Sequence, residues 1–278
     1  MIRILVDSSS DYLMEEIKEK NLEIAPIGIV IGDETYFDGQ NLERDHFYEM
    51  LVESKAFPQT SQPSPQEFLD IFKDVKERQD DLVCILLSSA LSGTYQSAVL
   101  AKQMVDYERI FLIDSLTATF NIKILADHAL DLVAQGKTAE EIVAAVEGMK
   151  SKVKVYAALD TLEYLARGGR ISKATAAIGQ LANIKPIITV SEQGEVSLLG
   201  KALGKNKAIS QMLQYLDELE IDTRFPAYTL YSYGVENCEH FQEKLTQAGI
   251  HVERQMQIGP TIGTHIGPGA FGVVFVSK

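Results

Sequence analysis

The 278-residue sequence predicts an α/β protein with two domains, one with a parallel sheet covered by helices on both faces and one with a mixed sheet. Three observations support this fold class. The length exceeds the usual size of a single domain. Strand-like and helix-like segments alternate through the first half, as in parallel α/β sheets. In the second half, Ser191-Glu192-Gln193-Gly194 is a hairpin signal among further α/β segments. We place the boundary near Lys150, which gives domains of residues 1–150 and 151–278.

Apolar patterning and helix caps predict the elements of the first half. The uninterrupted apolar run at residues 82–87 is typical of a strand buried on both faces. Ser64 and Glu67 form a capping box that starts a helix, and Thr138 and Glu141 form another. The expected strands are residues 3–6, 23–31, 82–87 and 109–113, and the expected helices are residues 11–20, 45–54, 65–75, 93–105, 117–135 and 139–149.

The second half is expected to combine a hairpin with further helices and strands. Residues 259–272 contain five glycines, so we expect a loop there, with residues 263–269 free to approach a partner closely. The expected strands are residues 153–159, 187–190, 195–199, 227–233, 252–257 and 273–276, and the expected helices are residues 161–165, 173–182, 205–219 and 238–248.

Composition excludes several classes of function. The net charge of −13 argues against nucleic acid as a partner, because binding a duplex requires clustered lysine and arginine. The negative charge also argues against permanent attachment to an anionic membrane. The two cysteines, Cys84 and Cys238, are far apart, so no metal or redox motif is expected. Residues 1–7 are too short for the apolar region of a signal peptide, and residues 83–101 are too polar for a membrane span. We therefore expect a cytoplasmic protein without a metal or cofactor.

An anion site is predicted where the buried strand at residues 82–87 ends and the next helix begins. Ligands of open α/β sheets bind at the carboxyl ends of strands. A helix N-terminus offers free N–H groups and a partial positive charge. Ser92 could therefore bind an anion together with the amides of Gly93 and Thr94. The alternative is that Ser92 only caps the helix.

Three further residues could join this site. Thr60 precedes another helix start, and its hydroxyl could complete a neutral clamp for a carboxylate. His265 lies among glycines, where a lone histidine is more often on the surface than catalytic. Arg170, with Arg167, belongs to a basic turn that could hold phosphate or carboxylate. This turn lacks the Lys-Ser/Thr of a P-loop, so an interdomain ion pair is the expected role.

Together, these segments closely resemble the DegV family along nearly the whole chain. The segments are Asp7-Ser8-Ser9-Ser10-Asp11, Thr60-Ser61-Gln62-Pro63-Ser64, Leu91-Ser92-Gly93-Thr94-Tyr95-Gln96-Ser97, residues 165–172 and residues 263–269. The resemblance implies a three-layer α/β/α domain, a two-layer α/β domain and a long-chain fatty acid held between them. It also implies that Thr60 and Ser92 bind the carboxylate, with His265 and Arg170 close behind. We include Ser61, Gly93 and Thr94 among the expected ligand-binding residues.

The resemblance also implies a protein partner. Some members of the family are the binding subunit of bacterial fatty acid kinase, which uses ATP to phosphorylate the carboxylate for phospholipid synthesis. In those members an arginine often precedes the helix that begins here near residue 205. This chain has lysines instead, so Lys201 and Lys205 are the expected contacts for the kinase. Transient membrane contact would allow the lipid to be exchanged.

Two enzymatic functions compete with a non-catalytic lipid carrier. In a serine hydrolase, Ser92 would be the nucleophile and His265 the base. Against this, the segment around Ser92 lacks the first glycine of the G-x-S-x-G elbow. A phosphate-handling enzyme could use Asp7, Asp114 and the basic turn, but capping of the following turns explains both aspartates equally well. We therefore favour the carrier.

Overall fold

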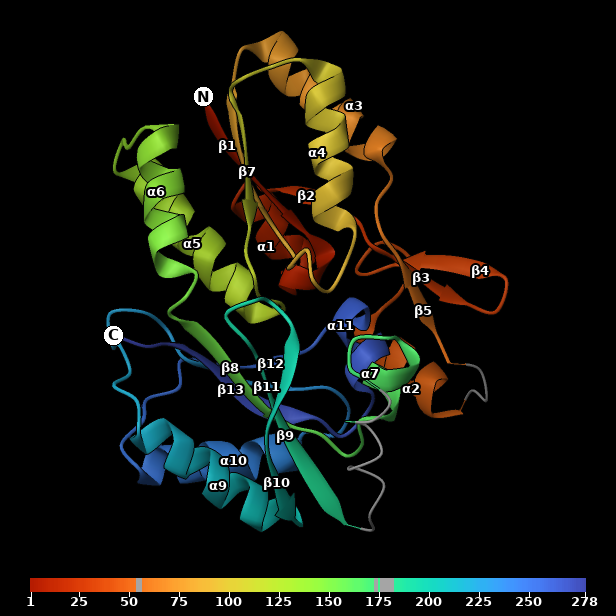
Figure 1. The fold of residues 1–278 in the computed structure, drawn as a ribbon, viewed down its shortest axis with the longest axis vertical. Helices are drawn as coiled ribbons and strands as arrows, with labels where there is room; N and C mark the ends of the chain where they lie inside the picture. The colour runs from red at the N-terminus through yellow and green to blue at the C-terminus, as the bar shows by residue number, and fades with distance from the viewer. Residues whose placement is uncertain (54–56, 173–174, 176–182) are drawn as a thin grey trace.

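The structure is a computed structural model that describes residues 1–53, 57–172, 175 and 183–278 (Figure 1). The helix predicted at residues 173–182 lies outside the described residues, apart from Thr175. Among the described helices, none is both long and apolar enough to cross a bilayer.

The first sheet has four parallel strands in the order β2 (Glu23–Ala25), β1 (Ile2–Asp7), β6 (Asp81–Leu86) and β7 (Ile110–Asp114). Strand β6 lies inside the sheet, and its residues from Leu82 to Leu86 are completely buried. This confirms the strand predicted from the apolar run, because a strand with helices on both faces exposes neither set of alternate side chains.

Helices cover both faces of this sheet, as predicted. Val83 and Ile85 pack in one apolar cluster with α5 (Phe120–Ala134) and α6 (Ala139–Met149). Leu82, Cys84 and Leu86 pack in another with α3 (Pro65–Arg78) and α4 (Thr94–Val105). Both predicted capping boxes are present, at the start of α3 and of α6. Figure 1 shows α5 and α6 on one side of the sheet and α3 and α4 on the other.

The single strand predicted at residues 23–31 is wrong. Pro26 divides it, because proline lacks the N–H group that a continuous ladder needs. Strand β2 stays in the parallel sheet. Residues after the proline enter a separate antiparallel sheet, in the order β4 (Glu34–Phe37), β3 (Gly28–Ile31) and β5 (Gln59–Ser61). Helix α2 (Arg44–Glu53) lies between β4 and β5 in the chain.

Two helices of the first half are shorter than predicted. The segment after β1 forms a 3₁₀ turn, η1 (Ser8–Ser10), and Asp11 has left-handed backbone geometry, so α1 (Met14–Glu19) begins later. Helix α5 begins at Phe120, after Thr119 with φ +58°. In both places, a residue with positive φ lies before the helix, and this backbone geometry does not continue a right-handed helix.

The second sheet is mixed, as predicted from the hairpin. Its order is β10 (Val196–Leu203), β9 (Ile184–Val190), β8 (Val153–Ala158), β13 (Phe271–Val276), β11 (Tyr228–Tyr231) and β12 (Arg254–Gln257). Strands β11 and β12 are parallel, and the other pairs are antiparallel. Helices α9 (Lys205–Asp217) and α10 (Glu236–Gln247) cover its outer face.

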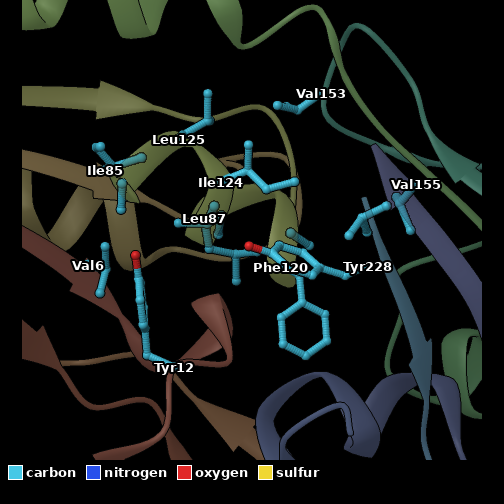
Figure 2. Close-up of a cluster of buried hydrophobic side chains, with 14 of the residues drawn as sticks. Val6, Tyr12, Ile85, Leu87, Phe120, Ile124, Leu125, Val153, Val155 and Tyr228 are labelled. Atoms are coloured by element: carbon cyan, nitrogen blue, oxygen red, sulfur yellow. The ribbon is translucent and has the colours of Figure 1, made fainter. Parts of the chain in front are cut away.

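The inner face of the mixed sheet packs against the parallel-sheet domain. Along β8, Tyr156 points to the outer helices, while Val155 on the alternate face joins a cluster that includes α5. Figure 2 shows Val155 and Tyr228 of the mixed sheet in the same apolar cluster as Phe120 and Ile124 of α5. The two domains therefore share one apolar core.

The glycine-rich segment before β13 is not simply a loop. It contains the short helix α11 (Pro260–Ile266), with Gly259 before it and Gly267, at φ +73°, after it. Proline at the first helical position and glycine past the last are typical helix boundaries. Helix α11 packs against α2 and α7 (Glu163–Arg167), and His265 is therefore held on a helix.

Candidate ligand-binding site

A cavity with about 770 Å³ of empty space, counted to its mouth, lies between the two domains. Leu87, Leu91 and Ala118 of the parallel-sheet domain line one side, and Val155 and Leu230 of the mixed sheet line the other. Fourteen of the twenty lining residues are apolar, so the body of any ligand that fills the cavity has to be apolar.

Four predicted residues from different segments line the same cavity. Thr60 comes from β5, Ser92 from the turn before α4, Arg170 from the turn after α7, and His265 from α11. Thr60 and His265 form a hydrogen bond of 2.8 Å between Oγ1 and Nε2. The structure thus brings together residues that are up to 205 positions apart in the chain.

His265 is a neutral imidazole at ordinary pH. Its pKa is lowered to about 4, mainly because the imidazole is buried and also because the positive charge of Arg170 lies nearby. Its Nδ1 atom is buried and has no hydrogen-bond partner among the described residues. That nitrogen lies against Gly168, where a Cβ atom would come within 2.3 Å. Gly168 therefore leaves the room that the imidazole occupies.

Ser92 is already engaged with the start of α4. Its Oγ accepts a hydrogen bond from the amide of Thr94 at 3.3 Å and lies 2.9 Å from Thr94 Oγ1. Gly93 is covered by Gln62, since a Cβ atom at residue 93 would lie 1.9 Å from Gln62 Oε1. Ser92 thus lines the cavity, and its hydroxyl also accepts the amide of Thr94, the first residue of α4, whose N-cap position is Gly93. The contact of Ser92 with an anion stays a prediction.

Arg170 contacts the other domain through a backbone carbonyl and not through a carboxylate. The interdomain ion pair predicted for this turn is therefore wrong, as far as the described residues show. Its Nε donates to the carbonyl of Leu91 at 2.9 Å, and no described carboxylate lies within ion-pair distance. Arg167 instead pairs with Glu163 of its own helix and stacks on Phe57. The charge of Arg170 therefore remains available to attract an anion at the cavity.

The segment Asp7–Asp11 forms hydrogen bonds with backbone groups and side chains next to the cavity. Asp7 accepts the amide of Leu87 at 2.7 Å. Ser8 accepts the amide of Ile27 at 3.0 Å and lies 3.1 Å from Thr261, a lining residue of α11. These contacts hold the strand ends and α11 in place. Asp7 and Asp114 therefore act as turn caps, since Asp114 accepts the amides of Ser89 and Leu116.

Three predicted residues do not line the cavity. Ser61 is exposed on β5, and neither Gly93 nor Thr94 is among the residues that line the cavity. Their role as direct ligands stays a prediction. Lys201 and Lys205 are exposed on β10 and α9, outside the cavity. Within the described part of the chain, no group of three metal-binding side chains could hold an ion.

Sequence reasoning missed several residues of the site. Gln62 and Gly168 shape the polar end, and both lie inside motif segments, so their position beside Thr60 and Arg170 was an available signal. The apolar lining residues gave no such signal, because they come from distant strands whose inward faces depend on how the domains pack. The lining residues not predicted individually include Ile27, Leu87, Ala118, Thr119, Ile188, Val190, Val196, Leu230, Ile258 and Ile262.

The fold and site define a two-domain α/β protein with a largely apolar interdomain cavity. The DegV family, described as uncharacterised, matches residues 1–278. A DegV domain-containing protein of Caldanaerobacter subterraneus subsp. tengcongensis is 37% identical over 279 residues, which cover 100% of this chain and 99% of that protein. The chain belongs to the DegV family, which confirms the resemblance seen in its motifs.

Two solved structures resemble the chain over nearly its full length. One, described as fatty acid binding of a DegV family protein from Thermus thermophilus, has a TM-score of 0.89 and 30% identity. The other, described as a stearic-acid-binding protein from Eubacterium ventriosum, has a TM-score of 0.88 and 27% identity. Each match covers 100% of this chain and 99% of the other. These similarities confirm the predicted fold class.

Proposed function

We propose that the protein binds one long-chain fatty acid in the interdomain cavity and carries it as a non-catalytic subunit. The observation that supports this most directly is that the cavity is lined mainly by apolar side chains and by a small set of polar ones. The walls are apolar, and Thr60, Ser92, His265 and Arg170 line the same cavity. Its relatives from Thermus thermophilus and Eubacterium ventriosum are described as fatty-acid-binding.

The energetics of such a ligand fit this cavity. Burying one methylene contributes roughly 0.8 kcal/mol, so a C16 chain contributes on the order of 11 kcal/mol before ordering costs. The head group then needs only orientation, which hydroxyl donors such as Thr60 and Ser92 can supply. Arg170 adds a positive charge, while two of its donors are already used by carbonyl groups.

The hydrolase alternative has weaker support in the geometry. A serine nucleophile needs its base within hydrogen-bond reach. Here the hydroxyl of Ser92 pairs with Thr94, and the imidazole of His265 pairs with Thr60. The second nitrogen of the imidazole has no orienting partner among the described residues. We therefore expect no turnover of p-nitrophenyl acyl esters by the wild-type protein, and turnover that disappears in Ser92→Ala and His265→Ala would contradict the carrier.

The proposed function is tested by removing the two hydroxyls. Thr60→Ala and Ser92→Ala should each weaken binding of palmitate roughly 10- to 150-fold, because a hydrogen bond to a charged group contributes about 1.5–3 kcal/mol. Calorimetry measures the affinity, and native mass spectrometry shows whether lipid copurifies. Thr246→Ala is the matched control, since this exposed hydroxyl on α10 bonds only its own helix. Unchanged binding in both site variants would contradict the assignment.

We further propose that the protein presents the carboxylate to an ATP-dependent fatty acid kinase for phospholipid synthesis. Lys201 and Lys205 are close in sequence and both exposed, as a docking surface requires. We also propose that the protein is cytoplasmic and that it contacts the membrane transiently to exchange lipid.

The kinase proposal predicts that one variant changes the rate of acyl phosphate formation without changing lipid affinity. Lys201→Glu with Lys205→Glu should slow kinase-dependent formation of acyl phosphate while leaving lipid affinity unchanged, because both lysines lie outside the cavity. Lys73→Glu is the control, an equal charge reversal at an exposed position of α3. Equal rates for wild type and the double variant would contradict the docking role, and a loss of lipid affinity would place these lysines at the pocket.

A further inference from the structure

The turn between β9 and β10 is fixed onto the parallel-sheet domain by a buried polar contact. The hydroxyl of Ser88 donates to the carbonyl of Gly194 at 2.8 Å, and Ser88 is completely buried. Gly194 has φ +80°, and a Cβ atom there would lie 2.1 Å from Ser88 Oγ and 3.2 Å from Leu116 Cα. Only glycine fits such a close approach with this geometry. Figure 1 shows the turn reaching from the mixed sheet to the lower end of the parallel-sheet domain.

Inward-facing residues of β8 and β9 lead from the polar end of the cavity toward this turn. Ala157 pairs with Ile188, and both line the cavity. Continuing the antiparallel register by two residues brings Val190 level with Val155, about 7 Å further along. Arg170 lies beyond the opposite end of β8, after α7. Val190 is therefore on the side of the cavity away from the arginine.

Val190 also borders a second hollow. This neighbouring hollow has about 450 Å³ of empty space and is lined by Val190 together with Val153, the next inward-facing residue of β8 after Val155. Its other walls are mainly polar and include Glu147 and Lys150, which form an ion pair. One valine side chain thus stands between an apolar cavity and a polar hollow.

We propose that Val190, held in position by the contact between Ser88 and Gly194, closes the far end of the cavity and sets the longest acyl chain that the protein accepts. This inference rests on the proposed function, since it assumes that the carboxylate lies at Thr60 and Ser92. A chain that reaches Val190 fills the cavity, and a longer chain has to displace this side chain. Val190 is then a specificity-determining residue.

The test compares affinities for saturated fatty acids of increasing length, from about 14 to 20 carbons, by competition binding and native mass spectrometry. In Val190→Ala the wall recedes, so the optimum should move to longer chains. Each added methylene that becomes buried should improve affinity about fourfold relative to wild type. Val190→Leu enlarges the same side chain, and the optimum should move to shorter chains. Val99→Ala is the control, because this half-buried valine of α4 lines neither hollow.

Opposite shifts in the two Val190 variants support the proposal. The same length optimum in wild type and both variants, with binding retained, overturns it and leaves the proposed function intact. A uniform loss of affinity at every length also overturns it, because Val190 would then contribute only to packing. If the wild type binds no fatty acid of any length, the proposed function fails, and this inference fails with it.

Discussion

Asp11 is a buried carboxyl that links three parts of the molecule. Its Oδ1 accepts the amide of Gly259 at 2.9 Å, and its Oδ2 accepts the hydroxyl of Thr119 at 2.6 Å. Its pKa is raised from 3.8 to about 7, mainly because the carboxyl is buried and also because the carboxylate of Asp38 lies nearby. The charge of Arg44 and the two hydrogen bonds lower the pKa without compensating for burial. The carboxyl of Asp11 therefore takes up a proton as pH falls through about 7 in the folded protein, and at a lower pH in the unfolded chain.

This shift predicts how stability depends on pH. A carboxyl whose folded pKa lies above its unfolded pKa contributes stability that is complete below the unfolded value and is lost as pH rises through the folded value. The free energy of unfolding should therefore fall, through this group, by about 1.4 kcal/mol for each pH unit between about 4 and 7. Asp11→Asn removes the titration but keeps an oxygen for Gly259. Denaturant unfolding of both proteins at pH 5 to 8 measures the difference in slope.

The difference between wild type and Asp11→Asn isolates this group, since His265 titrates equally in both proteins. Asp222→Asn is the control, because a hydrogen bond from Arg224 lowers the pKa of Asp222 to about 2. Asp222 then stays ionised from pH 5 to 8, and its replacement should leave the slope unchanged. Parallel stability profiles for wild type and Asp11→Asn would show that Asp11 keeps an ordinary pKa.

At the scale of elements, the helices and strands that were predicted correctly are those whose sequence signals lie within a few residues. Capping boxes at Ser64 and Thr138 and the apolar run of β6 were correct because a helix start or a doubly buried strand is encoded within a few residues. The failures have local causes too. Pro26 divides a strand that apolar content alone suggested, and Pro260 starts a helix inside a segment that its glycines suggested was a loop. In both cases the proline was the decisive residue, and the apolar or glycine content of the segment was misleading.

Sheet membership and the lining of the cavity could not be predicted in the same way. Whether Val155 faces the core or the outer helices depends on register, and a shift of one residue exchanges the two faces. The polar residues of the site were predictable because hydroxyls, glycines and a histidine clustered at strand and helix ends. Their hydrogen bonds were not, since the pairing of Thr60 with His265 depends on where α11 packs. The domain boundary near Lys150 stays a prediction.

At the scale of the whole molecule, the two domains are coupled through more than the cavity. One apolar cluster contains residues of both, including Phe120 and Tyr228 (Figure 2). Hydrogen bonds also cross between them, since Arg44 donates to the carbonyl of Gln257 at 2.6 Å and Tyr48 donates to that of Ile258 at 2.8 Å. Separating the domains would expose the shared core and break these bonds. We therefore expect the chain to unfold in a single cooperative transition.

A ligand between the domains should stabilise both at once. A fatty acid at a free concentration 100 times its Kd adds about 2.7 kcal/mol to the free energy of unfolding, if it binds only the folded protein. For a chain of this size, this corresponds to a rise in Tm of roughly 5 °C. Calorimetry should show one transition that moves as a whole. The methyl ester of the same acid keeps the acyl chain but lacks the carboxylate charge, so its shift should be smaller. Two transitions, of which the ligand moves only one, would show that a single domain holds the lipid and that the interdomain cavity is not its site.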